Sequence, residues 1–196
     1  GLQVGDRNAE VHAALLTVDV TESVVNEAIE KHCDLIISHH PLIFRGLKQI
    51  TGSTTQERCI EKAIRHNIAI YSSHTSMDVY LHGVSGKIAD KLDIINYHIL
   101  CPTTDDNVGL GVIGELKTPM KSDDFIHFVQ NIFDCSLRYI KPCDENITTV
   151  AICGGAGAEF ITQAIAQGAD IYITADMKYH EMQAAYGQIG VIDLDH

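Results

Sequence analysis

The sequence predicts an α/β fold made of two related αβ units, each a mixed sheet flanked by helices. Two observations predict this class: apolar runs of strand length alternate with segments of helical periodicity, and one block of the chain occurs twice. With 196 residues and 45% hydrophobic content, the chain can bury one large core or two small ones. We place the two units at residues 1–105 and 106–196.

The first unit opens with a buried strand over 13–20 and a helix that runs to about His32. Thr21 is placed to cap this helix through its hydroxyl group. Thr54 and Glu57 have the spacing of a capping box, so we expect a second helix to begin there. The remaining predicted elements of this unit are strands at 34–38 and 68–74 and a helix at 84–92.

The second unit shows the same alternation of strands and helices, with predicted strands at 108–116 and 148–153 and a helix at 122–133. The apolar run at 108–116 is a candidate surface strand whose edges would gain from pairing. Residues 153–160 are rich in glycine and open a helix, a pattern compatible with weak and unspecific phosphate binding. The chain lacks the G-x-x-x-x-G-K-[ST] pattern of a P-loop.

An internal repeat links the two units. Residues 147–176 align over 11–40 without a gap, which pairs strand with strand and Asp170 with Asp34. The alternative is that any two βα units look alike, but the shared Ala-Ile pair and the shared aspartate go beyond the general pattern. We therefore expect two copies of one αβ unit.

A second block of the repeat places 190–196 over 68–74, so that His196 lies opposite His74. His74 is followed at the fourth position by Asp78. If the repeat holds, His196 should also be followed at the fourth position by a carboxylate, beyond the printed sequence. We further expect both ends of the chain to be incomplete, because it begins without methionine and stops within a pattern.

Composition narrows the class of function. The formal net charge of −12, from 26 acidic and 14 basic residues, disfavours nucleic acid and anionic membrane surfaces as partners. No apolar segment approaches the roughly 20 residues of a membrane span, and no signal-peptide pattern opens the chain. The six cysteines never form a C-x-x-C pair, which favours a reducing, cytoplasmic location.

Two adjacent histidines, His39 and His40, directly follow a predicted strand in the segment DLIISHHPLIF at 34–44. Adjacent side chains on a strand point to opposite faces, so both can serve one site only if the strand has ended or if two metals are bound. Pro41 cannot donate a ladder hydrogen bond and favours an extended or turn conformation at His40, which is consistent with a strand end there.

The ends of other strands carry the same chemistry. His74 and His196 each close a predicted strand, and Asp78 follows in HTSMD. Ligands of open α/β sheets collect at the carboxyl ends of the strands. Because imidazoles with a carboxylate suit zinc, iron, manganese or nickel better than calcium, the sequence predicts a transition-metal site at the strand carboxyl ends, between the two units.

Each of these residues also has a plainer interpretation. Asp78 fits a turn or the start of a helix, and His74 fits either a ligand or a group that orients a ligand or a substrate. An isolated histidine is more often a surface or hydrogen-bonded residue than a ligand. We apply that interpretation to His12, His32, His66, His82, His98 and His127.

Several motifs together resemble one family over nearly the whole chain. They are, in order, GLQVGD, SHHPLIF, HTSMD, GVIGEL, ITADMKYHEMQAA and VIDLDH. Their order and character resemble the Ngg-interacting-factor-three-like proteins, also called GTP cyclohydrolase I type 2 homologues or dinuclear metal centre proteins. The combination is far more specific than any single motif.

The resemblance implies two divalent metal ions held by His39, His40, Asp78 and His196, together with a glutamate in an H-x-x-x-E arrangement. The printed sequence ends on the histidine of that arrangement, so the glutamate is absent from it. The resemblance also implies a ring-shaped homohexamer whose metal sites face an internal cavity. It leaves open which of zinc, iron, manganese and nickel is bound.

Two functions stay open at this point. The first is a metal-dependent hydrolase of a small, anionic, nucleotide-like or heterocyclic substrate, with His74 as the general acid or base. In that case Asp176, Lys178 and His180 are candidates for substrate binding, although the same segment fits a helix start. The second is a metal carrier, a chaperone or an interaction scaffold without turnover. GTP as the substrate follows from the family's name alone.

Overall fold

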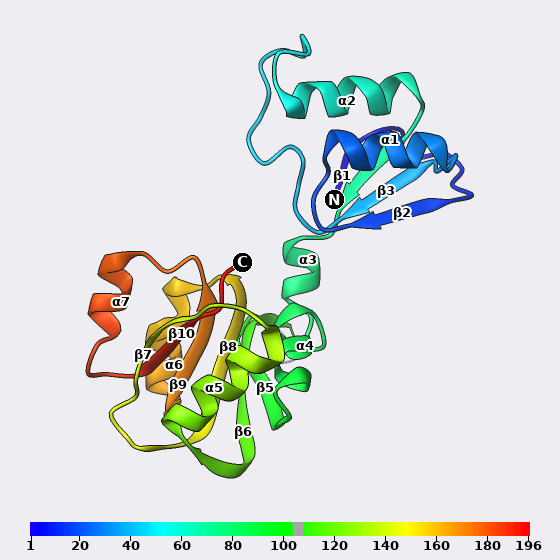
Figure 1. Cartoon of the computed structure of the whole chain (residues 1–196). Coiled ribbons are helices and arrows are strands. Elements are labelled where there is room, and N and C mark those ends of the chain that lie inside the picture. Colours follow the sequence, from blue (N-terminus) through cyan, green and yellow to red (C-terminus); the bar gives the residue numbers. More distant parts are fainter. Residues whose placement is uncertain (104–107) are drawn as a thin grey trace. The chain divides into compact units, whose positions relative to one another are not determined.

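The computed structural model describes residues 1–103 and 108–196 and consists of two compact units, Gly1–Ser76 and Met77–His196 (Figure 1). The boundary that the sequence predicts, between residues 105 and 106, lies outside the described residues. Residues 77–103 belong to the second unit because they supply a helix and an edge strand that pack into it. No described helix is long and apolar enough to span a bilayer.

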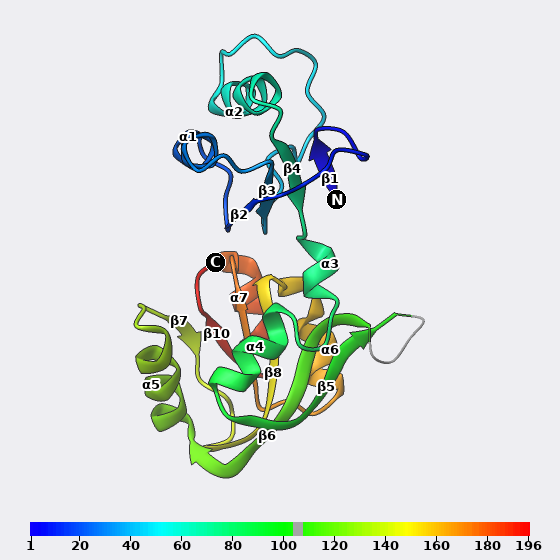
Figure 2. The same cartoon turned by 90° about the vertical axis from the view of Figure 1, so that its right-hand side faces the viewer.

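The first unit is a four-stranded sheet with two helices over one face, as Figure 2 shows. The strand order is β1-β4-β3-β2, with β2, β3 and β4 parallel and β1 antiparallel to β4. Its elements are β1 (Leu2–Val4), β2 (Ala14–Thr17), α1 (Glu22–Glu30), β3 (Leu35–Ser38), α2 (Thr55–Arg65) and β4 (Ala69–Ser72). A short helix, α3 (Thr75–Asp78), continues the chain into the second unit.

The helices begin where the sequence predicts. The backbone N–H of Val24 donates to the hydroxyl of Thr21, 3.3 Å away, at the start of α1. At the start of α2, Glu57 N–H donates to the hydroxyl of Thr54 at 3.2 Å. Hydrogen bonds from the N–H and hydroxyl of Thr51 to the Glu57 carboxylate lower the pKa of that group to about 2. The hydroxyl caps of Thr21 and Thr54 are therefore confirmed.

The second unit is a six-stranded mixed sheet with the order β5-β6-β8-β9-β10-β7. Its elements are α4 (Val84–Lys91), β5 (Ile94–Pro102), β6 (Gly109–Lys121), α5 (Ser122–Phe133), β7 (Arg138–Ile140), β8 (Asn146–Ala156), α6 (Ile161–Ala166), β9 (Ile171–Ala175), α7 (Tyr179–Ala185) and β10 (Gly190–Asp193). Apolar clusters bury both faces of the sheet, one against α4 and α5 and the other against α6 and α7. The fold class predicted from the sequence is confirmed.

The strand predicted at the surface, over 108–116, lies inside the sheet. The run at 108–116 was a candidate surface strand, but β6 pairs with β5 on one side and β8 on the other. Both of its edges are thus occupied within the chain, because the antiparallel β5 covers the edge that would otherwise be exposed. The apolar character of β6 therefore reflects burial in the sheet, and it is no evidence that this strand pairs with another copy of the chain.

The internal repeat is present at the level of single hydrogen bonds. The carboxylate of Asp34 accepts the backbone N–H groups of His12 and Ala13 at 2.8 and 3.2 Å. Asp170 accepts those of Thr148 and Thr149 at 2.7 and 2.8 Å. These residues are the equivalent ones in the ungapped alignment, and the parallel pairs β2·β3 and β8·β9 share the same register as far as Ile152. In each copy the aspartate ties the start of one strand to the start of the next.

The second block of the repeat is displaced by one residue from the predicted alignment. Ala69 N–H donates to the carbonyl of Asp34, and Gly190 N–H donates to that of Asp170, so these two donors are equivalent. Counting onward, His74 corresponds to Asp195 and not to His196. The prediction that His196 lies opposite His74 is wrong, because the register of β10 on β9 differs by one residue from the predicted alignment. A one-residue slip matters because it would reverse the face of every side chain on β10.

This shift changes one expectation about the site. The carboxylate four residues beyond His196 was inferred from the repeat and also from the family pattern. With the corrected register the repeat no longer gives that position, so only the family resemblance supports it. The equivalence of His74 and Asp195 is visible in the backbone, because both have left-handed φ angles, 36° and 68°.

Candidate metal centre

His39 and His40 lie beyond the end of β3, which stops at Ser38. Their imidazole rings lie side by side, with centroids 4.9 Å apart. The strand has therefore ended before the pair, and this is one of the two arrangements by which adjacent histidines can serve one site.

Two buried serines fix the backbone at this turn. The hydroxyl of Ser38 donates to the carbonyl of His40 at 2.7 Å, and that of Ser72 also reaches it, at 3.3 Å. The two hydroxyls lie 2.8 Å apart, and each serine is only 1% exposed. Because a buried hydroxyl without a partner is costly, these contacts make the turn a defined feature of the fold.

His74 follows β4 and joins the same cluster. Its N–H donates to the carbonyl of His39 at 3.0 Å, and its ring centroid lies 5.7 Å from that of His39 and 6.2 Å from that of His40. Its φ of 36° is left-handed, a conformation that costs a non-glycine residue on the order of 1–2 kcal/mol. Backbone strain of this kind is concentrated at functional sites.

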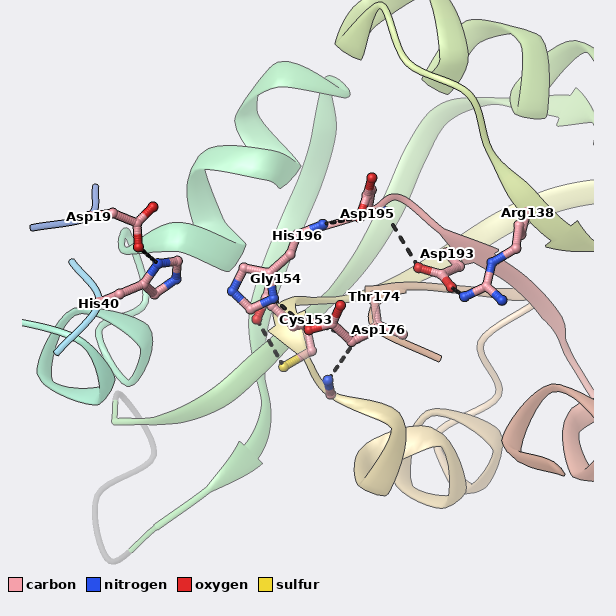
Figure 3. Close-up of polar contacts among 12 residues, drawn as sticks. Asp19, His40, Arg138, Cys153, Gly154, Thr174, Asp176, Asp193, Asp195 and His196 are labelled. Atoms are coloured by element: carbon pink, nitrogen blue, oxygen red, sulfur yellow. Dashed lines mark hydrogen bonds and ion pairs between the residues drawn. The ribbon is translucent and has the colours of Figure 1, made fainter. Parts of the chain in front are cut away.

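A carboxylate that the sequence analysis missed completes this cluster. Asp19 follows β2, and its Oδ1 lies 2.9 Å from Nδ1 of His40 (Figure 3). The side chain of His40 is 27% exposed and that of Asp19 is 64% exposed. The predicted strand over 13–20 contains Asp19, whereas β2 ends at Thr17 and leaves Asp19 at the same sheet edge as the histidines. The first unit thus gathers three imidazoles and one carboxylate at the carboxyl ends of its parallel strands.

The second unit builds a similar pair at the carboxyl ends of β9 and β10. Oδ2 of Asp176 lies 2.7 Å from Nδ1 of His196 (Figure 3). Asp176 has a left-handed φ of 55° just beyond β9. Gly155 lies beside the ring, since a Cβ there would be in ordinary van der Waals contact with Cε1 of His196, at 3.6 Å. Of the predicted substrate residues, Asp176 therefore contacts a predicted ligand.

The other two predicted substrate residues follow the plainer interpretation. Lys178 is the residue before α7, and its backbone N–H donates to the carboxylate of Glu181 at 2.7 Å. The side chain of Lys178 is 83% exposed, and His180 is exposed and stacks edge-on against Tyr179. These contacts are those of a helix start on the surface.

Asp78 is the last residue of α3, and its carboxylate acts on a buried thiol of the second unit. Burial raises the pKa of Cys153 to about 11, and the charge of Asp78 adds to this rise. The predicted ligands are divided between the units, with His39 and His40 in the first and Asp78 and His196 in the second. Within the described ranges, no three His, Cys, Asp or Glu side chains form a group that could hold a metal ion.

An ion pair with a buried carboxylate supports the strand that leads to His196. Asp193 is 4% exposed and pairs with the guanidinium of Arg138, which also donates to the carbonyl of Met177 at 2.8 Å. The N–H of Asp195 approaches the other oxygen of Asp193 at 3.4 Å. These residues line a cavity of about 260 Å³ beside Asp176. Arg138 thus connects β7, β10 and the turn that carries Asp176.

Replacing Arg138 with alanine is expected to lower the free energy of opening of the sheet edge formed by β7 and β10 by about 2–3 kcal/mol. The reason is that the Asp193 carboxylate would stay buried without its partner. The value is set below that of a fully buried pair because the Arg138 side chain is 64% exposed. Amide hydrogen exchange of peptides covering β10 measures the loss. The double variant R138A/D193N removes the uncompensated charge and should recover about half of it. Equal exchange in R138A and the parent would contradict this role.

The donor chemistry of the predicted ligands fits a transition-metal pair. Imidazole and carboxylate are the groups that zinc, iron, manganese and nickel prefer in proteins. Metal-binding histidines commonly carry a carboxylate on the other ring nitrogen, and both His40 and His196 do so. All six cysteines lie in the described ranges as free thiols, outside the implied ligand set.

Comparison with known proteins identifies the family. A family model described as Duf34/NIF3 (NGG1p interacting factor 3) matches residues 1–196. The chain belongs to this family. The resemblance found in the sequence motifs is thereby confirmed.

Two relatives match all or nearly all of the chain. A GTP cyclohydrolase 1 type 2 homolog of Clostridium acetobutylicum is 36% identical over 100% of this chain and 75% of its own length. A protein NIF3 homolog of Schizosaccharomyces pombe is 33% identical over 94% of this chain and 69% of its own length. The chain thus spans about three quarters of the first of these relatives.

Several solved structures share the fold. A Bacillus cereus protein related to NIF3 has a TM-score of 0.92 and 27% identity, covering 100% of this chain and 81% of its own. The Staphylococcus aureus protein SA1388 has a TM-score of 0.91 and 31% identity over 100% of this chain and 78% of its own. Reduced HcgD from Methanocaldococcus jannaschii has a TM-score of 0.81 and 25% identity, covering 100% of this chain and 77% of its own.

Proposed function

We propose that this protein is a dinuclear metal-dependent hydrolase that acts on a small, anionic, nucleotide-like or heterocyclic substrate. The observation that carries the proposal is the carboxylate on Nδ1 of both His40 and His196, an arrangement typical of metal-binding histidines. The names of relatives such as the Clostridium acetobutylicum protein support GTP as the first substrate to test. We include a cytoplasmic location and assembly into a homohexamer in the proposal, both on the family resemblance and composition alone.

In this proposal His39, His40, Asp78 and His196 hold two divalent ions of zinc, iron, manganese or nickel. A metal pair bound there supplies Lewis-acid activation of water and of the bond to be hydrolysed. The chain itself supplies the proton transfer. Thr75 Oγ1 lies 3.3 Å from Nδ1 of His74, so Nε2 of His74 is the atom proposed to take up and release the proton.

The test of metal binding is elemental analysis of protein purified without chelator. We expect about two equivalents of transition metal in the parent, as for a two-metal site. The variant H39A/H40A/D78A should retain almost none, because three of the implied ligands are lost. The matched control H66A/H127A/D144A removes two exposed histidines and an exposed aspartate from elsewhere on the surface and should retain the parent's metal.

The outcomes separate the candidate functions. Equal metal content in the parent and in H39A/H40A/D78A would contradict the ligand assignment, and metal-free parent protein would leave an interaction scaffold as the better interpretation. Metal in the parent without turnover of nucleotides would favour a carrier or chaperone. Turnover that requires the metal would support the hydrolase.

A further inference from the structure

We propose that Asp19 and Asp176 are positioning residues that fix His40 and His196 in the tautomer with hydrogen on Nδ1. The inference rests on the proposed function insofar as it makes these two histidines metal ligands. It adds Asp19, which lies outside the motifs, and it gives Asp176 a role other than the substrate binding considered for it above; neither residue is in the implied ligand set. Both act through an imidazole and not by touching the metal.

The geometry of the two contacts is nearly the same. The distance from carboxylate oxygen to Nδ1 is 2.9 Å for Asp19 and His40 and 2.7 Å for Asp176 and His196. An ionised carboxylate only accepts hydrogen bonds, so in a neutral ring the hydrogen must lie on Nδ1. The lone pair is then on Nε2, which becomes the nitrogen able to bind a metal.

The tautomer choice matters because a neutral imidazole has only one nitrogen with a lone pair. A ring with its hydrogen on Nε2 would have to exchange tautomers before that nitrogen could bind a metal. A partner on Nδ1 also limits rotation of the ring and raises its basicity. The two aspartates therefore prepare each histidine before the metal arrives.

The two pairs are not copies of each other, although they lie in related units. In the ungapped alignment His40 corresponds to Asp176, so the histidine of one pair occupies the place of the aspartate in the other. Beyond Ile152 the register of β8 on β9 shifts, so the gapless alignment does not give the place of Asp19 in the second unit. Duplication alone would have placed like residues at like positions. The two units reach the same contact from different strands, which indicates that the contact itself has a role.

The local backbone supports the aspartate in each pair. Thr17 Oγ1 donates to the carbonyl of Asp19 at 2.9 Å, which closes the turn after β2. Asp176 has a left-handed φ, a conformation that aspartate tolerates better than most residues. Arg138 holds the neighbouring Met177 carbonyl at 2.8 Å. Both carboxylates are therefore presented by defined turns.

The first measurement is the tautomer of each histidine in the metal-free chain, by long-range ¹⁵N–¹H correlation at about pH 8, where imidazole is neutral. Signals of His40 and His196 are assigned from H40A and H196A. In the parent we expect the Nδ1–H form for both. D19A should shift His40, and D176A should shift His196, toward the Nε2–H form. D19N and D176N keep an acceptor oxygen and should keep the Nδ1–H form.

The second measurement is zinc affinity by competition with a chelator. Loss of such a carboxylate typically weakens metal binding by about 10–100-fold, which we expect for D19A and D176A, with the asparagine variants in between. E10A is the matched control, because Glu10 is an exposed carboxylate whose Oε1 lies 3.6 Å from Nε2 of His12, outside the site. E10A should leave both tautomers and the zinc affinity unchanged.

The two proposals fail in different ways. If the parent binds zinc and D19A and D176A change neither the tautomers nor the affinity, the positioning role is wrong and the metal site stands. If the tautomers shift as expected but the parent binds no zinc, the metal site is wrong and the aspartates still set the tautomers. Unfolding of an alanine variant is recognised from its amide spectrum, and the asparagine variants then decide the question.

Discussion

Replacing His74 with glycine should lower the turnover number of the metal-loaded protein by about 10²–10⁴-fold, the usual contribution of a general acid or base. The reason is that the ring of His74 lies within 5.7 and 6.2 Å of the His39 and His40 rings, measured between centroids, and is not in the implied ligand set. Metal content should remain that of the parent. GTP turnover and elemental analysis on the same sample check both expectations.

Glycine is the informative substitution at this position. The φ of 36° is strained for histidine and unstrained for glycine, so H74G should fold at least as stably as the parent. A loss of activity then reports on the ring and not on the fold. H74A keeps the strain and removes the ring, and it should lose the same activity with lower stability than H74G.

Two results would contradict the catalytic role of His74. Unchanged turnover in H74G would exclude the ring as the acid or base. A loss of metal together with the loss of turnover would make His74 a ligand, which is the alternative that the sequence leaves open. H66A is the control, because His66 is an exposed histidine of the same unit at the end of α2.

Replacing Phe125 with alanine should destabilise the second unit by about 3–5 kcal/mol, the usual cost of truncating a fully buried phenylalanine. Phe125 lies in α5, is 0% exposed and packs in the apolar cluster between α4, α5 and the sheet. The deletion leaves a cavity that close-packed neighbours can fill only in part. Ile152 and Ile173 belong to the same cluster.

Hydrogen exchange followed by mass spectrometry measures this effect unit by unit. In F125A, the exchange rates of peptides from β8 and β9 should rise by the factor that corresponds to the whole loss in unfolding free energy. The exchange rates of peptides from β3 and β4 should match those of the parent. F128A is the control on the same helix, because Phe128 is only partly buried and should cost roughly half as much. An equal effect of F125A in peptides from both units would show that the two units unfold as one.

Much of the fold followed from neighbours in the sequence. Hydroxyl caps at Thr21 and Thr54 and the helix over 122–133 lie where the pattern predicts, because each depends on residues within a few positions of one another. The strand end before His39 was likewise readable from the proline two residues later. Family membership was recognisable because several short motifs occur in one order.

The partners of the site residues could not be predicted in the same way. Asp19 lies 21 residues before His40, and Asp176 lies 20 before His196, so only the pairing of strands brings each couple together. The alignment of His196 with His74 failed for a related reason. That alignment was based on shared residue types, whereas the hydrogen bonds between β10 and β9 set the register in the structure.

The sequence by itself determined the class of fold, the helix starts, the histidines at strand ends and the family. Those features rest on periodicity and local hydrogen bonds, which act over a few residues. The tertiary structure decided the inner position of β6, the register of β10 and the carboxylate partners of His40 and His196. These depend on which strands pair and in which register, and strand pairing is set by packing between residues far apart in the chain.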